Sequence, residues 1–589
     1  MELQGVQESA SWRKESFIAA LASGPKKKKQ KMAEQKNLSG VEKIKMASDA
    51  LRGTLKDSLL DEITGAVREH DHALVKFHGM YEQDDRDLRE ERAAQKLDKL
   101  YSFMIRLRIP GGLITPEQWI AAHHIAGKYS TGVIKITTRQ TIQLHGILKG
   151  HIKPTLKDFD AVKLDSIAAC GDVNRNVIAS SHPSVSPLHK YIHDYASRIS
   201  EAHLPKTRAY YEVWLDEEKL IDKKEEEDPL YQDRYLPRKF KIAVAIPPDN
   251  DVDVFGNDVG LIAIVENGKL LGFNLAVGGG LSSTHGNPAN YPRLASVIGY
   301  VPEAKVMKAV YEVLTVQRDF GNRSDRKLAR LKYTVDRMGI PAFKEELEKR
   351  CGFKLEEAKP YTFTRRRDHF GWEQSSDGGW HYTVFVENGR VLDDEKLALK
   401  TALLLVAETG KASFRFTPNQ NLILSDIAGD DKATIEKILT EFKIIEHTEN
   451  ASEVRKTAVS CVALPTCPLA LAEAQRYLPT LISKIEPLLE KHQLLQEEIH
   501  VRMTGCPNGC GRSPLAEIGF VGTAPGKYNL HIGGDRLGER LNIKYKDALD
   551  EASILNELDN LFGAYSKNRN SGESFGDFVL RENYVTSLN

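Results

Sequence analysis

An α+β fold made by internal duplication is the architecture that this sequence predicts, and three observations lead to it. The chain has 589 residues, more than the roughly 250–300 at which a single hydrophobic core stops growing, so we expect about three domains. Hydrophobic residues make up 41% and charged residues 28% of the chain, which supports large cores and excludes wholesale disorder. Finally, a β-α-β pattern and a larger α/β pattern each occur twice.

The smaller repeat is a strand, a helix and a pair of strands. Its first copy places a strand at 106–110, a helix over Glu117–Gly127 and two strands within 133–145. Its second copy places them over Tyr382–Val386, Glu395–Thr409 and 413–424. In both copies apolar residues alternate on either side of a polar turn, as half-buried strands require.

The larger repeat is marked by glycines. Val259-Gly260 leads to Gly268–Gly279, and Ile518-Gly519 leads to Gly526–Gly534. The two copies lie too far apart for a solenoid, so we expect two halves related by a pseudo-twofold axis, with the functional site where they meet. The segment 278–283 lacks the third glycine of a dinucleotide-binding fingerprint, and a glycine turn is the better interpretation.

Charge and hydropathy narrow the function classes. Lys+Arg and Asp+Glu are both 82, so no net charge favours a nucleic-acid or membrane partner. No apolar run approaches the roughly 18–20 residues of a membrane span, and the apolar stretch 16–22 is too short for a signal peptide. We therefore expect a cytoplasmic protein, in which clustered cysteines indicate metal ligation or catalysis rather than disulfides.

Four of the six cysteines form two pairs, Cys461 with Cys467 and Cys506 with Cys510. Four thiolates can hold either a zinc ion or an iron–sulfur cluster. The five residues between the first two cysteines exceed the usual zinc-ribbon spacing, which favours a cluster, although zinc and unligated thiols remain open. Cys170 and Cys351 stand alone and are expected to be ordinary buried thiols.

Several basic residues would attract little attention by themselves. Lys239 and Lys241 are two apart on an expected strand and would be interpreted as an exposed stripe. Arg175, between two asparagines, is typical of a loop-stabilising arginine, and His145 of a satisfied strand histidine.

The segments Thr504-Gly-Cys-Pro-Asn-Gly-Cys-Gly-Arg512 and Leu464-Pro-Thr-Cys-Pro-Leu-Ala470 resemble the cofactor site of the sirohaem-containing sulfite and nitrite reductase family. The similarity is greatest to the haemoprotein (beta) subunits of assimilatory NADPH-sulfite reductases and extends from about residue 41 to 585. Three further motifs occur in order, Thr137-Thr-Arg-Gln-Thr141, Gly171-Asp-Val-Asn-Arg-Asn176 and Leu236-Pro-Arg-Lys-Phe-Lys241. The segment before residue 41 departs from the family pattern.

The resemblance implies a set of site residues. Cys461, Cys467, Cys506 and Cys510 would hold a [4Fe–4S] cluster, and Cys510 would also be the axial ligand of the sirohaem iron. The substrate-binding, catalytic cations implied are Arg106, Arg175, Lys239 and Lys241. The sirohaem contacts implied are Lys135, Arg139, Gln143, His145, Arg238 and Asn508, of which Arg139, Gln143 and His145 are expected on one strand face. Asn419 replaces the arginine equivalent to Arg139 in the second repeat, so only one of the two symmetry-related sites should hold cofactor.

The implied function is the six-electron reduction of sulfite to hydrogen sulfide, in assimilatory sulfate reduction and cysteine biosynthesis. No flavin or nicotinamide site is evident, so electrons must come from a partner: an NADPH-dependent flavoprotein (alpha) subunit is implied, and ferredoxin is the alternative. Nitrite reduction is the first alternative reaction, but family members that reduce nitrite tend to carry asparagine at the position of Lys241. A non-catalytic zinc protein is the alternative from another class.

The same resemblance divides the chain. The expected divisions are a disordered extension (1–40), an N-terminal helical arm (41–94), a ferredoxin-like repeat (95–167), a first sirohaem-binding lobe (168–371), a second ferredoxin-like repeat (372–447) and a second lobe with the cysteines (448–589). A central domain formed by the two ferredoxin-like repeats, flanked by two larger α/β lobes, is the fold expected.

Overall fold

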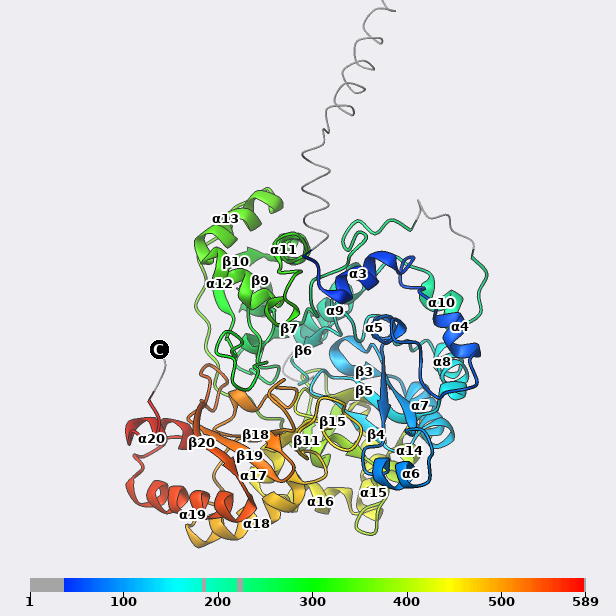
Figure 1. Ribbon diagram of the computed structural model, residues 1–589. Helices are drawn as coiled ribbons and strands as arrows, with labels where there is room; N and C mark the ends of the chain where they lie inside the picture. The colour runs from blue at the N-terminus through cyan, green and yellow to red at the C-terminus, as the bar shows by residue number, and fades with distance from the viewer. Residues whose placement is uncertain (1–36, 183–186, 220–225, 587–589) are drawn as a thin grey trace, which may run out of the picture.

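The computed structural model describes residues 37–182, 187–219 and 226–586, and its strands form five-stranded sheets that occur in two pairs (Figure 1). The disorder expected for residues 1–40 concerns a stretch that lies, apart from 37–40, outside the described residues. One pair of sheets is antiparallel and belongs to the ferredoxin-like repeats, and the other pair is mixed and belongs to the lobes.

The two antiparallel sheets exchange a strand. The first has the order β1 (Met80–Asp84), β2 (Tyr101–Arg106), β5 (Ile142–Ile147), β4 (Ile134–Ile136), β13 (Arg390–Val391). The second has the order β11 (Gly371–Gln374), β12 (Trp380–Val384), β15 (Leu422–Ile427), β14 (Ser413–Phe416), β3 (Leu113–Ile114). Each repeat therefore closes the edge of its own sheet with a two-residue strand from the other repeat, which removes an exposed edge from both.

Two glutamines join the repeats reciprocally. Gln140 Nε2 donates to the Phe416 carbonyl at 3.1 Å, and Gln420 Nε2 donates to the Ile136 carbonyl at 3.3 Å. Both glutamines have a positive φ, 49° and 73°, at the turn between the paired strands. Their oxygens accept from the first strand of each lobe, from Ala179 N at 2.9 Å and from Ser460 N at 3.1 Å. The pseudo-twofold axis expected from the sequence is thus visible in individual hydrogen bonds.

The helices α7 (Pro116–Tyr129) and α14 (Leu399–Glu408) pack against each other over the two sheets. Thr115 begins α7 with a capping box, in which its hydroxyl accepts from Gln118 N and the Gln118 side chain accepts from Thr115 N. The second helix begins four residues later than expected, because Asp394 accepts from the backbone N–H groups of residues 396 and 397 and fixes a turn there.

The two lobes have the same sheet topology, with two parallel pairings followed by two antiparallel ones. The first lobe contains β6 (Ile178–Ala179), β7 (Ile242–Ala245), β8 (Val259–Glu266), β9 (Lys269–Val277) and β10 (Ser296–Pro302), with α9 (Pro187–Ala202), α11 (Val306–Phe320), α12 (Leu331–Met338) and α13 (Ile340–Cys351). The second contains β16 (Val459–Ser460), β17 (Val501–Thr504), β18 (Ile518–Ala524), β19 (Lys527–Ile532) and β20 (Ile543–Leu549), with α17 (Glu453–Thr457), α18 (Leu478–Lys491), α19 (Glu551–Asn568) and α20 (Phe575–Arg581). The repeated strand pairs predicted from the glycine pattern are confirmed.

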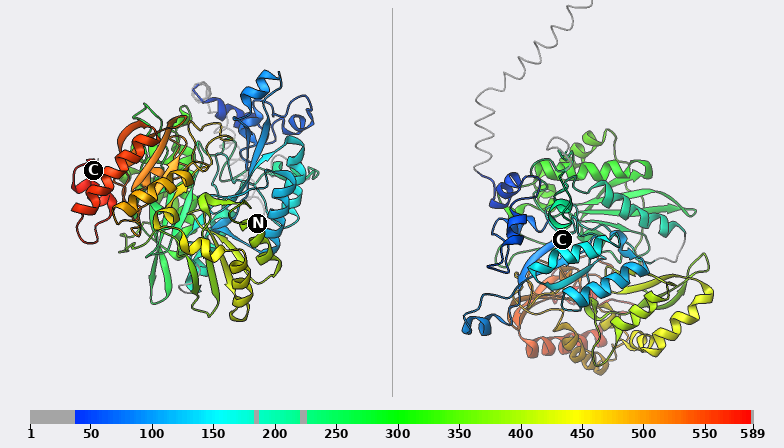
Figure 2. Two further views of the ribbon diagram at one scale, coloured as in Figure 1. Left: turned by 90° about the horizontal axis from the view of Figure 1, so that it is seen from below. Right: turned by 90° about the vertical axis from the view of Figure 1, so that its right-hand side faces the viewer.

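The lobes lie one above the other beside the paired repeats, green and orange to red in Figures 1 and 2. The largest buried apolar cluster is continuous through the first repeat, the first lobe and the second repeat, whereas residues 454–585 form a core of their own. The short 3₁₀ turns 254–256 and 513–515 precede β8 and β18, and each follows a residue in the left-handed region, Asp253 and Arg512. These two residues form an ion pair of 2.8 Å between the lobes.

The N-terminal segment was expected to be helical and is only partly so. Its helices are α3 (Gly40–Ala47), α4 (Leu55–Leu60), α5 (Asp71–Leu74) and α6 (Arg89–Ala94). Between the last two lies β1, which pairs with β2 from Met80 opposite Ile105 to Asp84 opposite Tyr101. Its polar sequence hid the strand, because burial of its residues comes from the neighbouring strand and loops rather than from alternating apolar side chains. The remaining helices are α8 (Ile152–Asp160), α10 (Ala209–Trp214), α15 (Lys432–Glu441) and α16 (Ile444–Asn450).

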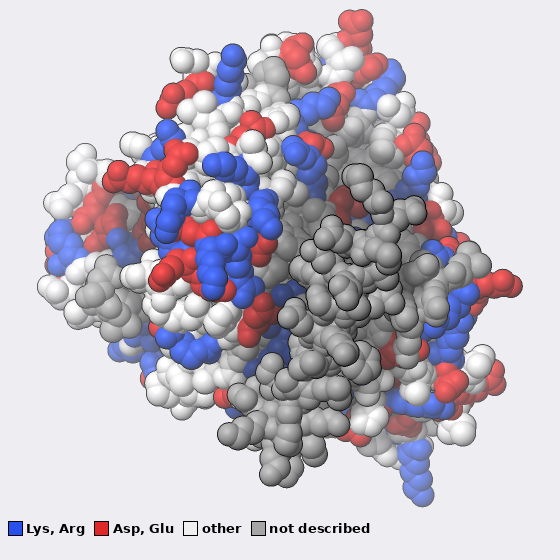
Figure 3. All heavy atoms as spheres, turned by 90° about the horizontal axis from the view of Figure 1, so that it is seen from above, with Lys and Arg blue, Asp and Glu red and all other residues white. Residues whose placement is uncertain are grey.

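In the part of the chain described, no helix is long and apolar enough to cross a bilayer. Where the face drawn in Figure 3 is not covered by grey atoms, Lys and Arg side chains are interspersed with Asp and Glu. This mixture agrees with the equal numbers of basic and acidic residues in the sequence.

Candidate active site

The four cysteines lie on two adjacent loops of the second lobe. Cys461 directly follows β16, and Cys506 lies two residues beyond the end of β17. The second loop needs its glycines: a Cβ on Gly505 would lie 2.5 Å from the Ala472 carbonyl, and one on Gly511 would lie 2.5 Å from the Met503 carbonyl. Close packing of these turns against the neighbouring backbone brings the two cysteine segments together.

None of the cysteines forms a disulfide, and the four sulfurs lie close enough to influence one another. Burial and then the neighbouring Cys510 raise the pKa of the Cys467 thiol to about 11. The Gly505 N–H donates to Cys461 Sγ and the Asn508 amide donates to Cys506 Sγ, both at 3.3 Å. Hydrogen bonds of this kind stabilise thiolate ligands and tune iron–sulfur clusters.

The spacing of the sulfurs distinguishes a cluster from a single zinc ion. Sulfurs around tetrahedral zinc, with Zn–S bonds of about 2.3 Å, are about 3.8 Å apart. Among the described residues, no three cysteine sulfurs lie within 4.8 Å of one another. The cysteine sulfurs therefore do not show the close spacing of a single zinc ion's ligands.

Arg106, Gln143 and Lys135 form a row across the first antiparallel sheet. Gln143 on β5 lies opposite Arg106 on β2 and opposite Lys135 on β4. The Gln143 amide oxygen accepts from Arg106 Nε at 2.7 Å, and the amide nitrogen donates to His145 Nε2 at 3.3 Å. Arg106 also donates to Cys170 Sγ at 3.1 Å. Lys135 is buried and its ammonium donates to the Asn388 carbonyl, so it is tied to the second repeat.

His145 lies beside this row and is neutral. Burial, followed by the nearby Lys135 and Arg106, lowers the pKa of its imidazole to about 3. Its Nδ1 lies 3.0 Å from the Gln83 side-chain oxygen on β1, which positions Nδ1 as the donor. Both ring nitrogens of His145 are thus engaged by neighbouring side chains, and the neutral imidazole adds no charge to the site.

Lys239 and Lys241 lie in the extended segment just before β7, with Phe240 between them pointing into the core at 1% exposure. Asp258 holds this segment in place by accepting from Lys241 N at 2.9 Å. Within the described residues, neither ammonium has a hydrogen-bond or ion-pair partner. Burial lowers the pKa of Lys239 to about 7, and burial together with Lys239 holds the pKa of Lys241 well below its usual range. The Cys510 sulfur is the neighbour that opposes both shifts.

Arg175 and Arg238 complete the basic group. Arg175 is buried, and its Nε donates to the Gly171 carbonyl at 2.8 Å. Burial and the neighbouring Arg326 lower the pKa of Arg238 to about 10. No hydrogen bond or ion pair satisfies the Arg238 guanidinium among the residues described. The structure thus gathers the predicted cations on one side of the cysteine loops, instead of spreading them as a solvated stripe.

The position of Arg139 differs from the expectation that it shares a strand face with Gln143 and His145. It lies in the turn between β4 and β5 and not on the strand face that carries Gln143. Its guanidinium donates to Asn257 Oδ1 at 2.6 Å and to the Ile242 carbonyl at 3.0 Å. The five polar residues between Ile136 and Ile142 form the turn and end the strand, so the alternation cannot be extended backwards through it.

Three residues that the sequence did not single out support the site. Asp258 and Arg330 are both buried and form a two-bond ion pair, at 2.7 and 3.1 Å. Thr138 donates to the Cys510 carbonyl at 3.1 Å and links the first repeat to the cysteine loop. A signal for Asp258 exists in the sequence, because an acidic residue precedes each of the repeated Val-Gly and Ile-Gly pairs, Asp258 in one half and Glu517 in the other.

The glycine turn 278–283, which lacks a complete nucleotide-binding fingerprint, packs against the cysteine loop. A Cβ on Gly509 would lie 2.7 Å from the Leu281 carbonyl, and Gly509 has a φ of +66°. Ser283 N donates to the Pro507 carbonyl at 2.8 Å. The loop that carries Cys506 and Cys510 is therefore fixed by the first lobe as well as by its own lobe.

The donor set fits a polycarboxylate tetrapyrrole. Lys239, Lys241 and Arg238 offer charged groups that no described residue satisfies, and the buried Nε of Arg139 has no hydrogen-bond partner. These half-buried cations without partners are suited to an anionic ligand in this pocket. Sirohaem, with its many carboxylates, and an oxyanion substrate are both anionic ligands of this kind.

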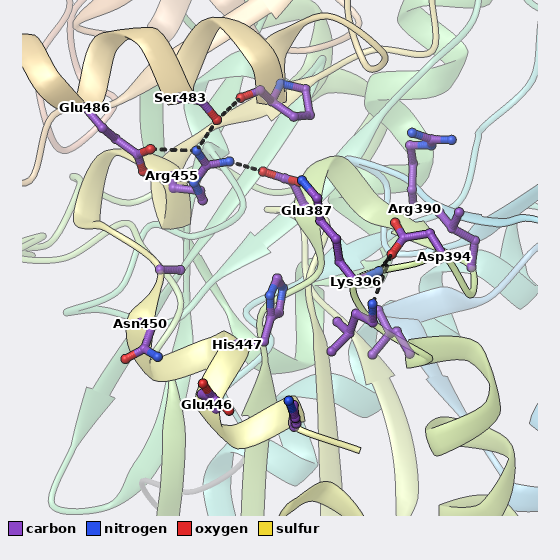
Figure 4. Close-up of a pocket in the computed structure, with 16 residues that line it drawn as sticks. Glu387, Arg390, Asp394, Lys396, Glu446, His447, Asn450, Arg455, Ser483 and Glu486 are labelled. Atoms are coloured by element: carbon purple, nitrogen blue, oxygen red, sulfur yellow. Dashed lines mark hydrogen bonds and ion pairs between the residues drawn. The ribbon is translucent and has the colours of Figure 1, made fainter. Parts of the chain in front are cut away.

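A separate hollow of about 620 Å³ lies away from these residues, between the second repeat and the second lobe (Figure 4). Arg455 crosses it, bonded to Glu387 and, at 2.7 Å, to Glu486. Its charged groups largely neutralise one another, and nothing in it matches the cofactor chemistry of the cysteine site.

Comparison with known proteins decides the family. Residues 95–162 and 373–442 match the nitrite/sulfite reductase ferredoxin-like half domain, and residues 195–355 match the nitrite and sulphite reductase 4Fe-4S domain. The chain belongs to the nitrite and sulfite reductase family. The two half-domain matches cover the duplicated β-α-β units, and the third match lies in the first lobe, outside the cysteine segments.

Relatives from this family align along almost the whole chain. A sulfite reductase [NADPH] hemoprotein beta-component of Leptospira biflexa is 64% identical, covering 93% of this chain and 99% of its own length. Proteins with that name from Staphylococcus saprophyticus and Bacillus subtilis are 52% and 50% identical, covering 94% and 93% of this chain and 97% and 96% of theirs. The solved structure of the Mycobacterium tuberculosis NirA protein is 25% identical, with a TM-score of 0.75 over 93% of this chain and 97% of that one.

These matches confirm the fold and the cofactor class. The chain is an oxidoreductase of the nitrite and sulfite reductase family, with the duplicated α+β architecture and with a [4Fe–4S] cluster and sirohaem as cofactors. The assignment of individual side chains to cluster, haem and substrate remains a prediction of the sequence motifs and the geometry above.

Proposed function

We propose that this protein reduces sulfite to hydrogen sulfide in a six-electron reaction at a sirohaem linked to a [4Fe–4S] cluster. One observation carries the proposal: the ammonium groups of Lys239 and Lys241 lie near Cys510 without any partner among the described residues. A pocket with half-buried cations that lack partners, next to a cysteine assigned as a metal ligand, suits the binding of a small, doubly charged oxyanion.

The cofactors carry the electrons to the substrate, because side chains alone cannot perform this redox chemistry. Cys461, Cys467, Cys506 and Cys510 would hold the cluster, and Cys510 would also serve as a ligand to the sirohaem iron. Arg139, Gln143, His145, Arg238, Lys135 and Asn508 are assigned to the sirohaem. Because the Lys135 ammonium is bound to Asn388, we expect its contribution to be electrostatic.

The basic residues bind and orient the substrate. At about 4 Å and an effective dielectric of about 20, each cation–anion contact is worth on the order of 4 kcal/mol before desolvation. Arg106 and Arg175 present planar guanidinium groups, which can donate two hydrogen bonds to an oxyanion. Their backbone-bonded positions, at Ala169 and Gly171, fix them before substrate arrives.

The two lysines are suited to move protons. An ordinary lysine with a pKa near 10.4 holds its proton too tightly to be an effective acid at neutral pH. Burial brings the pKa of Lys239 to about 7, so its ammonium can donate a proton to an oxygen of the bound anion and be reprotonated from solvent. Lys241, which is adjacent to it, can relay or share that role.

Electrons have to arrive from another protein, and an NADPH-dependent flavoprotein subunit is the donor that we propose. The names of the aligned relatives, hemoprotein beta-components of sulfite reductase [NADPH], support it. A ferredoxin remains the alternative donor. A cytoplasmic location fits the six cysteines, none of which forms a disulfide. We also propose domain limits at 95, 168, 372 and 448, which follow the pattern of the same family.

The test is a balance of electrons and products in the purified holoenzyme. With reduced methyl viologen as donor, we expect six viologen radicals to be oxidised for each sulfide formed and sulfite to be preferred over nitrite in kcat/KM. A two-electron stoichiometry, or nitrite turnover far above sulfite turnover, would contradict the proposal. Supplying a flavoprotein with NADPH, or ferredoxin, in place of viologen identifies the physiological class of donor.

A further inference from the structure

A second cluster of potential metal ligands lies outside the cysteine site. His182, His369 and Glu373 each offer one ligand atom, and these atoms all lie within 4.8 Å of one another. His182 Nε2 is 2.8 Å from Glu373 Oε2, and His369 Nδ1 is 3.5 Å from Glu373 Oε1. The two imidazole rings are 4.2 Å apart and inclined at 69°. The group is the one set of three such residues with this spacing in the part of the chain described.

A fourth histidine stands behind the three. His381 on β12 lies directly opposite Glu373 on β11, and its Nε2 is 3.4 Å from Glu373 Oε2. Its side chain is only 1% exposed, and its Nδ1 is buried without a hydrogen-bond partner. The imidazoles of His182, His369 and His381 thus all face the Glu373 carboxylate, whereas a simple ion pair involves a single histidine.

The surroundings have the arrangement that orients histidine ligands. In metal sites the ring nitrogen that does not bind metal usually faces a carboxylate or carbonyl. Here His369 directs Nδ1 towards Glu373, while its Nε2 lies 3.6 Å from Asp249. Asp249 is held in turn by Arg365 at 3.0 Å. His369 Nδ1 is therefore presented to the centre of the cluster by a fixed carboxylate behind it.

We propose that His182, His369 and Glu373 bind a divalent transition-metal ion such as Zn²⁺ or Fe²⁺. Two histidines and one carboxylate are the donor set of His₂Glu zinc sites and of facial-triad iron sites. His381 is within reach as a fourth ligand after a small shift. The site is separate from the [4Fe–4S] cluster and sirohaem, and it does not rest on the proposed reaction.

Its position in the fold explains what the ion does. His182 follows β6 in the first lobe, whereas Glu373 lies on β11 of the second repeat and His369 lies two residues before that strand. By sheet order, β11 and β12 correspond to β1 and β2, and β6 corresponds to β16, after which Cys461 lies. The histidine cluster is therefore the pseudo-twofold counterpart of the cysteine and cation pocket, and its ion fastens the first lobe to the second repeat.

The test measures zinc in the intact holoenzyme, because the cofactors contain no zinc. The protein is dialysed against Zn²⁺ and then against metal-free buffer, and zinc and iron are counted per chain by mass spectrometry. We expect one retained zinc per wild-type chain with unchanged iron. His369→Gln and Glu373→Gln should each weaken zinc binding at least 10-fold, and Asp249→Asn by about 10-fold.

A matched control removes a histidine–carboxylate pair elsewhere. Asp559→Asn breaks the 2.7 Å contact of His492 and should leave zinc binding unchanged. The proposal is overturned if the wild-type chain retains no zinc, or if the cluster variants retain as much zinc as the control. If a variant loses its visible chromophores, X-ray absorption at the zinc edge of the wild-type protein decides: nitrogen and oxygen ligands support the site, and sulfur ligands refute it.

Discussion

The two halves of the molecule have the same backbone plan but different chemistry at the same place. In the first repeat the turn residue Arg139 donates to Asn257 at 2.6 Å. In the second repeat the equivalent Asn419 accepts from Arg512 at 2.9 Å. The roles of the arginine and the amide are reversed across the axis. Arg139 and Arg512 each keep a buried Nε without a hydrogen-bond partner, so the two sides differ in whether the guanidinium comes from the repeat or from the lobe.

The loops that follow the first strand of each lobe also differ between the two halves. Ser180 follows β6 where Cys461 follows β16, and histidines gather near the first and cysteines near the second. The comparison teaches that duplication supplies two equivalent pockets, while a few substitutions decide which one carries the redox cofactors. Function therefore resides in the side chains placed on the fold, and not in the fold itself.

Replacing the shared cysteine tests this asymmetry most severely. We expect Cys510→Ser to reduce sulfite reduction to background, because a serine oxygen is a poor replacement for a soft thiolate between iron centres. Sulfide production and the visible spectrum are the measurements. Cys351→Ser, at a buried cysteine in α13, is the control and should remain active. Full activity in Cys510→Ser would remove this residue from the ligand set.

Exchanging the turn residues tests whether one position selects the cofactor side. Arg139→Asn should lower sirohaem content below one tenth of the wild-type value and cost about 2–3 kcal/mol of unfolding free energy. Three acceptors would lose a charged donor, namely the Asn257 amide oxygen and the carbonyls of Asn176 and Ile242. Haem content per chain and urea denaturation measure the two effects. The reverse change, Asn419→Arg, should add no second haem, and a second equivalent would contradict our account.

The lysine that distinguishes sulfite from nitrite gives a smaller effect. With Lys241→Asn, we expect the ratio of kcat/KM for nitrite to that for sulfite to rise about 10-fold, equivalent to ~1.4 kcal/mol, because a doubly charged anion loses more than a singly charged one. Steady-state assays with both anions provide the ratio. An unchanged ratio would show that Lys241 does not set the preference.

Protonation of Lys239 should make anion binding depend on pH. Its pKa of about 7 means that the ammonium is charged below pH 7 and neutral above it. Affinity for nitrite, which stays a monoanion over this range, should therefore fall about 5- to 10-fold from pH 6 to pH 8. Spectral titration at both pH values measures this. Lys239→Arg should flatten the dependence, since a guanidinium stays charged, and an undiminished slope in that variant would rule out Lys239.

The reciprocal glutamines provide the mildest test, because here the halves should behave alike. Gln140→Ala and Gln420→Ala each remove two buried hydrogen bonds and should each lower the free energy of unfolding by about 1–2 kcal/mol. Urea denaturation measures both variants. Only Gln140→Ala should also lower sirohaem content, because Gln140 adjoins Arg139. Equal haem loss in both variants would contradict the assignment of sides.

The sequence predicted the duplicated plan because alternation and repeated glycines are local signals. It could not predict the strand exchange, since β3 and β13 are two residues long and carry no periodicity. It also missed β1, whose residues are polar. The clustering of Lys239, Lys241 and Arg175 followed from family motifs alone. The sequence also did not show that Asp258 binds the backbone N–H of Lys241 instead of its ammonium.

The buried ion-pair network between the lobes was beyond sequence reasoning for the same reason. Asp253 receives Arg366 and Arg502 at 2.6 Å, together with Arg512. These residues come from three distant segments, and no spacing rule connects them. Their pairing is decided by the pseudo-twofold packing of the lobes, which only the three-dimensional structure displays.

The exchange of β3 and β13 has a consequence for how the protein is made. Residues 113 and 114 cannot take their place in a sheet until residues 414 and 415 have left the ribosome, and the loop that carries Cys510 emerges later still. Prosthetic groups therefore enter a chain whose synthesis is almost finished, and a nascent fragment ending between the halves presents unpaired strand edges that call for protection by chaperones.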